Sequence, residues 1–280
     1  MNKIKNFKKE SNYLVCIDSD GSAIDTMTEK HLKCFGPVLV EVWGLNEIKK
    51  EFLNKWNKIN LYSSTRGINR FRGLVETFKV LKAEGIEMPE IKNLENWVKN
   101  SEELSNPALE KEIEKREDNT DLKLALKWSQ ELNKAISILQ KDISKVFMGV
   151  KASLEKMYKK ADLAVVSSAN NEALLDEWHS YELDNYVKII LGQEAGAKAE
   201  NIKELMDKGY DKDKVLMIGD ALGDLRAAEE NNVLFYPILA GKEEKSWQLL
   251  FEEASDKFFA GEYKGEYEAK LIEKFKSVLS

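Results

Sequence analysis

The fold is decided by Tyr13-Leu14-Val15-Cys16-Ile17-Asp18-Ser19-Asp20-Gly21-Ser22, an apolar run that ends in acidic and small residues. A short run of this kind is typical of a buried strand in a parallel sheet. Side chains two apart on a strand point to the same side, so Asp18 and Asp20 can converge on one site. Gly21 allows the backbone to turn sharply beside a ligand. Taken alone, the stretch is also compatible with an ordinary strand that ends in an acidic turn.

Later segments have the same character as this first strand, namely residues 163–166, 215–218 and 233–236. Helical patterns lie between them, over residues 172–183, 198–208 and 224–231. Strands that alternate with helices predict an α/β fold with a doubly wound, Rossmann-like parallel sheet. Ligands of such sheets bind outside the carboxyl ends of the strands. The polar residues that follow the predicted strands are therefore the candidates for a functional site.

The strand pattern disappears between residues 25 and 149, where apolar residues recur at spacings of three and four. This periodicity indicates amphipathic helices, one of them running from Leu122 to Val146. The charged segment 102–121 contains the breaker Asn106-Pro107, and we expect it to link helices across the surface. We predict an α/β domain of residues 1–24 and 150–280 and an inserted all-α domain of residues 25–149. The tail from residue 243 onward has helical spacing and is expected to pack on the α/β domain.

Polar side chains stand at the ends of the other predicted strands or at the start of the following helices. Ser167 and Ser168 follow the second strand, and small hydroxyl groups there can hydrogen-bond a phosphoryl oxygen. Lys198 opens a helix, where a cation opposes the helix dipole and can be held for a ligand. Asp220 and Asp224 follow the third strand, and a carboxylate pair there suits a hard cation such as Mg²⁺. Each signal alone is also explained by helix capping or by a solvated side chain.

In their order along the chain, these signals would converge on one crevice and resemble the motifs of the haloacid dehalogenase-like superfamily of hydrolases. Those motifs are a strand ending in D-x-D-G-T/S, a strand ending in Ser or Thr, a Lys, and G-D-x-x-x-D. Here they read Asp18-Ser19-Asp20-Gly21-Ser22, Ser167, Lys198 and Gly219-Asp220-Ala221-Leu222-Gly223-Asp224. The all-α insertion after the first motif is similar to the helical cap domain of this superfamily.

The resemblance implies a role for each matching residue. Asp18 would be the nucleophile that accepts the phosphoryl group, and Asp20 would act as general acid and then as general base. Ser167 and Lys198 would bind the phosphoryl oxygens. Outside the matching positions, we expect Ser168 to bind the substrate. Mg²⁺ would be held by the Asp18 carboxylate, the Asp20 backbone carbonyl and Asp220, with Asp224 as a further ligand or a partner of the ligands. Catalysis would then rest on positioning and charge neutralisation.

Asp20 favours a phosphatase or a phosphomutase, because a P-type ATPase of this superfamily would carry Thr at position 20 and a dehalogenase would lack an acid there. The resemblance therefore implies a magnesium-dependent phosphohydrolase acting on a small phosphorylated metabolite, with a phosphomutase as the nearest alternative. A receiver-like signalling protein also joins acidic residues, a phospho-accepting Asp, Ser or Thr and Lys on a parallel sheet. The long insertion after the first strand does not suit a receiver. The substrate cannot be read from the sequence.

One segment of the insertion, residues 63–72, holds Arg66, Arg70 and Arg72, three of the five arginines in the chain. Arginine is a fork-shaped donor suited to carboxylate or phosphate groups. We expect Arg66, Asn69 and Arg70 to bind the part of the substrate beyond the transferred phosphoryl group. The alternative is that these arginines pair with acidic neighbours on the surface of the insertion.

The bulk composition limits the classes of partner that the protein can bind. The chain has 280 residues, 43 Lys plus Arg, 49 Asp plus Glu and a formal net charge of −6. This mildly acidic balance argues against nucleic-acid binding, which depends on neutralising phosphates. No apolar stretch approaches the length of a membrane span, and the first apolar run is too short for a signal peptide. We expect a cytoplasmic protein without a membrane partner, and the sequence says nothing about oligomeric state.

Overall fold

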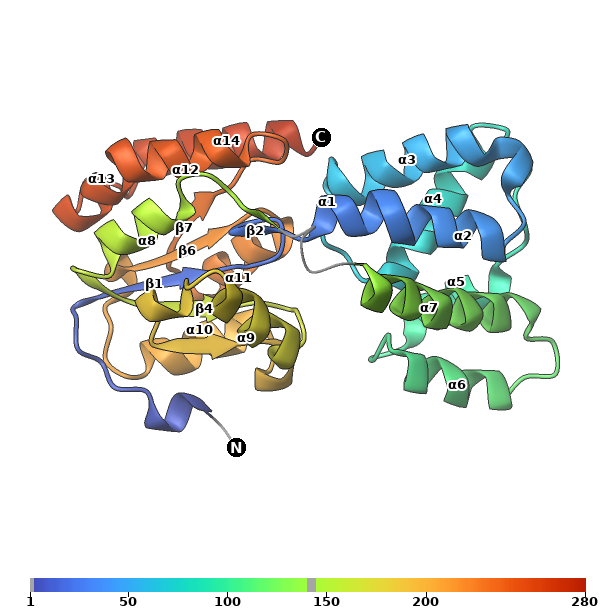
Figure 1. Cartoon of the computed structure of the whole chain (residues 1–280), viewed down its shortest axis with the longest axis horizontal. Helices are drawn as coiled ribbons and strands as arrows, with labels where there is room; N and C mark the ends of the chain where they lie inside the picture. The colour runs from blue at the N-terminus through green and yellow to red at the C-terminus, as the bar shows by residue number, and fades with distance from the viewer. Residues whose placement is uncertain (1–2, 140–144) are drawn as a thin grey trace. The chain divides into compact units, whose positions relative to one another are not determined.

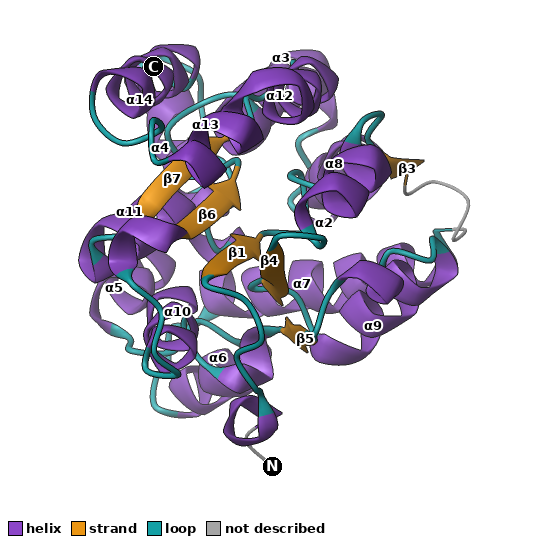
Figure 2. Ribbon diagram, turned by 90° about the vertical axis from the view of Figure 1, so that its left-hand side faces the viewer, coloured by secondary structure: helices purple, strands orange, loops and turns teal. Residues whose placement is uncertain are grey.

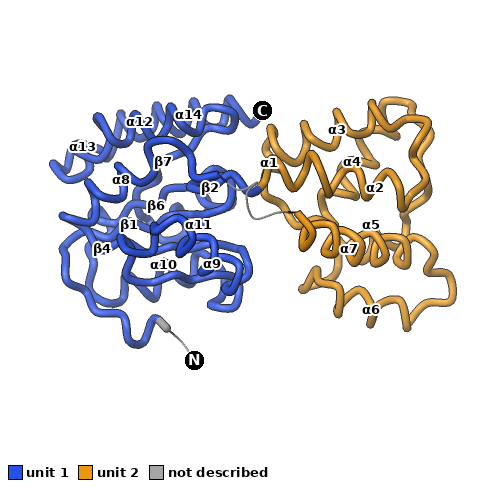
Figure 3. The backbone as a smooth tube through the Cα atoms, in the orientation of Figure 1, with its two compact units in different colours: residues 1–26, 144–280 blue, residues 27–143 orange. Residues whose placement is uncertain are grey.

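The computed structural model describes residues 3–139 and 145–280 of the chain. Two compact units make up the protein (Figure 3): residues 1–26 with 144–280, called here the α/β unit, and residues 27–143, called the helical unit. Within the described residues, none of the helices combines the length and apolar character that crossing a membrane requires.

A five-stranded parallel sheet forms the centre of the α/β unit (Figure 1). Its strands, in the order in which they pair, are β5 (Ile189–Leu191), β4 (Ala161–Val166), β1 (Tyr13–Ile17), β6 (Val215–Gly219) and β7 (Leu234–Pro237). The first strand is central: Val15 lies opposite Leu163 on one side and Leu216 on the other. This sheet confirms the predicted fold class. Strand β5 was not among the predicted strands, because a run of three apolar residues is too short to predict.

Helices cover both faces of this sheet, as the burial of successive side chains of β1 on both faces requires. Val15 and Ile17 pack in one apolar core with α8 (Val150–Met157), α9 (Asn171–Ser180), α12 (Glu243–Leu249) and α13 (Ser255–Ala260). Leu14 and Cys16 pack in a second core with α10 (Lys198–Met206), α11 (Leu222–Asn231) and α14 (Glu266–Val278). The sheet is therefore doubly wound, and the helical tail packs on it as predicted.

The helical unit contains α1 (Met27–Lys30), α2 (Gly36–Val42), α3 (Lys49–Leu61), α4 (Arg70–Ala83), α5 (Lys92–Asn100), α6 (Asn106–Glu114) and α7 (Thr120–Ile138). Figure 2 shows these helices in purple. Their common core is aromatic, with the buried side chains of Phe52, Trp56, Phe71, Phe78, Trp97 and Trp128. The all-α character expected of the insertion is confirmed. The tryptophans of this unit fill its core.

Two local predictions for the insertion were wrong. The segment 102–121 is not a plain link, because α6 begins at Asn106 with Pro107 in its first turn, where proline has no hydrogen bond to lose. The helix predicted up to Val146 ends at Ile138, and Val146 belongs to the two-residue strand β3 (Lys145–Val146). That strand pairs with β2 (Ile24–Asp25) and brings together the segments on either side of the helical unit. The predicted position Ile143 lies outside the described residues.

Candidate active site

Three buried carboxylates meet at the carboxyl edge of the sheet. Asp18 follows β1, Asp220 follows β6, and Asp224 lies in the first turn of α11. One oxygen of each lies within 4.8 Å of an oxygen of the others, and none of the three residues is more than 4% exposed. They meet because β1 and β6 are neighbours in the sheet, and the Asp18 N–H donates to the Ile218 carbonyl at 2.9 Å.

Lys198, the first residue of α10, reaches into this cluster. Its Nζ lies 2.8 Å from Asp18 Oδ1 and 2.5 Å from Asp224 Oδ1. Burial lowers the pKa of the Lys198 ammonium, but the charges of Asp18 and Asp224 outweigh burial and leave that pKa raised. The cation at this helix start, unfavourable for the helix dipole, is therefore stabilised by the carboxylates.

The cluster carries more negative charge than Lys198 can balance. Burial raises the pKa of the Asp18 carboxyl well above its ordinary value; Lys198 opposes this rise, while Asp224 and Asp220 add to it. Burial likewise raises the pKa of Asp224. Three carboxylates beside one ammonium require further cationic charge or bound protons to be stable together. Oxygen donors packed this closely are the ligands that Mg²⁺ prefers, so the residues present fit such an ion.

Hydrogen bonds to both carboxylate oxygens fix the side chain of Asp224. Its Oδ2 accepts the Ala221 N–H at 3.0 Å, while its Oδ1 accepts Lys198. Gly219 makes room for it, since a Cβ at position 219 would lie 2.3 Å from the Cβ of Asp224. Both oxygens of Asp224 thus already accept hydrogen bonds, and Asp224 orients Lys198 as well as the turn after β6.

Two buried tryptophans anchor the loop after β1, which the sequence alone did not reveal. Trp178 Nε1 donates to Ser19 Oγ at 2.9 Å, and Trp247 Nε1 donates to the Ser22 carbonyl at 2.7 Å. Gly21 adopts a φ of +80°, which favours glycine. Asp20 is half-buried and stands apart from the carboxylate trio, with its Oδ1 buried and lacking a hydrogen-bond partner among the described residues.

The two serines predicted for phosphoryl binding differ in exposure. Ser167 directly follows β4, is 1% exposed, and its N–H donates to the Leu191 carbonyl of β5 at 2.9 Å. Ser167 Oγ accepts the Ala169 N–H at 3.2 Å. Ser168 is exposed. Because β4 neighbours β1 in the sheet, these serines lie at the same edge as Asp18.

The residues predicted for substrate binding in the insertion have contacts within the helical unit. Arg66 is buried and donates to the Leu61 carbonyl at 2.7 Å. Asn69 caps α4 by accepting the Phe71 N–H, and its Nδ2 donates to the Leu104 carbonyl at 2.9 Å. Arg70 donates to Ser129 Oγ at 3.0 Å and to Asn133 Oδ1 at 2.7 Å, both neutral groups. Burial lowers the pKa of the Arg70 guanidinium.

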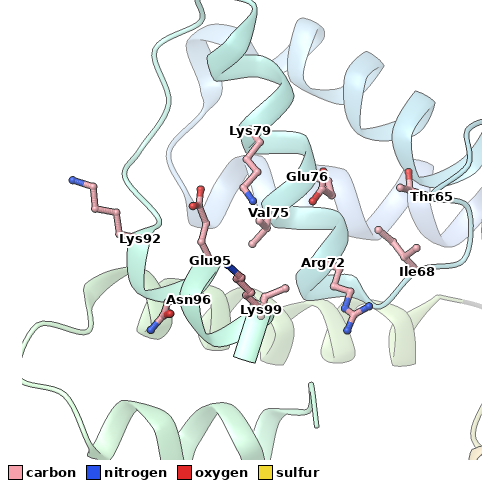
Figure 4. A pocket seen from close by; sticks show the side chains of 11 residues that line it. Thr65, Ile68, Arg72, Val75, Glu76, Lys79, Lys92, Glu95, Asn96 and Lys99 are labelled. Atoms are coloured by element: carbon pink, nitrogen blue, oxygen red, sulfur yellow. The ribbon is translucent and has the colours of Figure 1, made fainter. Parts of the chain in front are cut away.

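A groove of about 790 Å³ lies elsewhere on the helical unit, between α4 and α5 (Figure 4). Its lining mixes cations with carboxylates, namely Arg72, Lys79, Lys92 and Lys99 with Glu76 and Glu95. The four cations outnumber the two carboxylates, so the lining carries a net positive charge in which cations and carboxylates are mixed. The predicted site residues are not part of its lining.

Comparison with known families gives one match. A sequence model described as haloacid dehalogenase-like hydrolase matches residues 89–238, which is more than half of the chain. The matched range contains Ser167, Lys198 and Asp220, while Asp18 lies before its start. No curated protein matches the sequence.

Solved structures with a similar fold are more numerous. A candidate β-phosphoglucomutase from Thermotoga maritima is 16% identical, with a TM-score of 0.51 over 86% of this chain and 99% of that one. A candidate phosphoglycolate phosphatase from Lactobacillus delbrueckii subsp. bulgaricus is also 16% identical, with a TM-score of 0.50 over 82% and 87%. At this identity, the likeness concerns the fold alone.

Proposed function

Because the chain belongs to the haloacid dehalogenase-like hydrolase family, we propose that it is a phosphohydrolase that uses Mg²⁺ and forms an aspartyl-phosphate at Asp18. Its substrate would be a small phosphorylated metabolite. The observation that carries this proposal is the buried contact of Asp18 with Lys198, beside Asp220 and Asp224. A carboxylate held against an ammonium at the edge of a parallel sheet is placed to attack a phosphoryl group that the same ammonium neutralises.

The reaction has two steps, each with a balanced transfer of protons. In the first, an oxygen of Asp18 bonds to phosphorus, the bond from phosphorus to the leaving oxygen breaks, and Asp20 gives that oxygen a proton. In the second, Asp20 takes a proton from water and the water oxygen bonds to phosphorus. The bond between phosphorus and the Asp18 oxygen breaks, which releases phosphate and restores the Asp18 carboxylate. Ser167, Ser168 and Lys198 hold the phosphoryl oxygens in both steps.

The ion would be held by the Asp18 carboxylate, the backbone carbonyl of Asp20 and Asp220, with Asp224 as a further ligand or as a partner of these ligands. When bound, it supplies the positive charge that lets the anionic nucleophile and the anionic substrate approach each other. Asp224 would contribute chiefly by orienting Lys198, since both of its oxygens already accept hydrogen bonds.

The direct experiment is to incubate the purified protein and Mg²⁺ with a panel of phosphorylated metabolites and to measure phosphate release. Phosphate release with steady turnover is the expected result. A phosphomutase would use the same residues, and accumulation of a bisphosphate in place of free phosphate would identify it. Stable phosphorylation by acetyl phosphate, without turnover, would instead indicate a receiver-like protein.

The role of Asp20 predicts a dependence on the leaving group. Asp20→Asn should slow phosphoryl transfer by about 10²- to 10⁴-fold for a sugar phosphate, whose alkoxide leaving group needs a proton. An aryl phosphate should lose less, because its leaving group is stable without protonation. Single-turnover rates for the two substrates measure the difference. Equal losses would show that Asp20 is not the general acid.

We also propose that Arg66, Asn69 and Arg70 bind the remainder of the substrate, and Arg70 offers the sharpest test. Its guanidinium donates to two neutral partners and can still donate to an anionic group. Arg70→Ala should raise KM for the natural substrate with little change in kcat, and Arg70→Lys should rescue only part of the loss.

The matched control is Arg72→Ala, because Arg72 is exposed and stands two residues away on the same helix. An aryl phosphate provides the second comparison, since it lacks the groups that Arg70 would contact. If replacements of Arg66, Asn69 and Arg70 all leave the ratio of kcat/KM for the two substrates within about twofold, these residues do not select the substrate.

A further inference from the structure

Two loops at the carboxyl edge of the sheet are joined by a set of hydrogen bonds. The first loop, residues 167–170, follows β4 and carries Ser167; the second, residues 192–197, follows β5 and leads to Lys198. The Glu194 carboxylate links them, with Oε1 accepting Asn170 Nδ2 at 2.6 Å and Oε2 accepting the Asn171 N–H at 2.9 Å. In return, Asn171 Oδ1 accepts the Gly192 N–H at 2.7 Å.

The backbone of the two loops also comes close at this point. The Gln193 N–H donates to the Ala169 carbonyl at 2.8 Å. A Cβ on Gly192 would lie 2.5 Å from that same carbonyl oxygen, so the loops can approach only because position 192 is glycine. The contact is therefore specified by side chains from both loops and by a glycine in one of them.

The orientation of the Asn170 amide is fixed, which makes the link to Glu194 directional. Asn170 Oδ1 caps α9 by accepting the N–H groups of Glu172 and Ala173 at 3.0 and 3.3 Å. Reversing the amide would lose this cap, so its Nδ2 has to face position 194. Only an acceptor at position 194 suits that arrangement.

We propose that Glu194 is a positioning residue that holds the Ser167 loop and the Lys198 loop together, so that both residues meet the same phosphoryl group. This role rests on the proposed function. The link begins three residues after Ser167 and four residues before Lys198, so it controls the spacing of these two phosphoryl-binding groups. Because every substrate shares the transferred phosphoryl group, loss of the link should affect all substrates by the same factor.

The test exchanges donor and acceptor across the link. Glu194→Gln leaves one acceptor oxygen for two donors, Asn170 Nδ2 and the Asn171 N–H, so its NH₂ group opposes one of them. Asn170→Asp keeps the helix cap but sets two carboxylates against each other. In the double variant, the new carboxamide at position 194 donates to the new carboxylate at position 170, and the hydrogen bond is restored with reversed polarity. Glu172→Gln is the matched control, because Glu172 is exposed and its side chain takes no part in the link.

We expect each single variant to lower kcat/KM by about tenfold, and the double variant to return to within about threefold of wild type. The factor should be equal for an aryl phosphate and a metabolite, and competitive inhibition by inorganic phosphate should weaken with it. Glu194 is exposed, so Tm should hardly change and unfolding would not explain the loss. The amides of Asn171 and Gly192 should exchange hydrogen faster in the single variants and recover in the double variant.

The possible failures are distinct. A wild-type protein that releases no phosphate would overturn the proposed function, and the positioning role with it. An active wild type would overturn the positioning role alone if the single variants matched Glu172→Gln, or if the double variant were no better than either single one. Tighter inhibition by inorganic phosphate after Glu194→Gln would also overturn it, because Glu194 would then only repel the substrate.

Discussion

Replacing Asp18 with Asn is expected to lower turnover by about four to six orders of magnitude, because the substitution keeps the shape but removes the attacking carboxylate. The fold should persist, since the carboxamide fills the same buried position at the end of β1 and relieves part of the negative charge around Lys198. Steady-state turnover of an aryl phosphate, measured beside Tm, tests both expectations.

The matched control is Asp207→Asn, which makes the same change at an exposed position at the end of α10. Its turnover should equal that of wild type. Substantial turnover by a thoroughly purified Asp18→Asn protein would mean that the phosphoryl group is not transferred to residue 18.

Removal of divalent cations is expected to abolish turnover. One carboxylate oxygen from each of Asp18, Asp220 and Asp224 lies within 4.8 Å of the others, and Lys198 contacts two of these residues. An incoming phosphate would therefore add negative charge to a cluster that is already negative. EDTA should stop the reaction and added Mg²⁺ should restore it. Ca²⁺ should restore little, because its larger and more variable coordination would misplace the attacking oxygen.

EDTA that is already saturated with magnesium should have no effect, which separates chelation from inhibition by EDTA itself. A readout other than activity is available, because an ion that binds the folded state raises Tm. Mg²⁺ should raise the Tm of wild type more than that of Asp220→Asn. Full activity in a chelated, metal-free preparation would rule out the magnesium requirement.

The parallel sheet could be predicted because its central strands are short apolar runs that end in polar residues. The edge strand β5 could not, since Ile189–Leu191 is too short to stand out from the sequence around it. Helix α6 was hidden by Pro107, which reads as a breaker unless it is known to lie in a first turn. The strand was missed because its signal is too short, and the helix was missed because the meaning of a proline depends on its position within the helix.

The carboxylate cluster was within reach of sequence reasoning, because Asp18 and Asp220 follow strands that neighbour each other in the sheet. The residues that hold the cluster in place were not. Trp178 lies 159 residues from its partner Ser19, and Trp247 lies 225 residues from Ser22. Such pairings depend on how helices pack on the sheet, and a periodic apolar pattern shows only that a tryptophan is buried.

The most direct test of the aspartyl-phosphate is to trap it in the Asp20→Asn protein with an aryl phosphate and Mg²⁺. This substrate should still phosphorylate Asp18, while the hydrolysis that needs Asp20 as a base is slowed. The reaction is quenched in acid, and borohydride converts the aspartyl phosphate into homoserine, which is located by peptide mass spectrometry. We predict a burst of the phenol leaving group equal to the amount of protein, with homoserine at residue 18. Release of the phenol without a burst, or a burst with reduction at another residue, would contradict attack by Asp18.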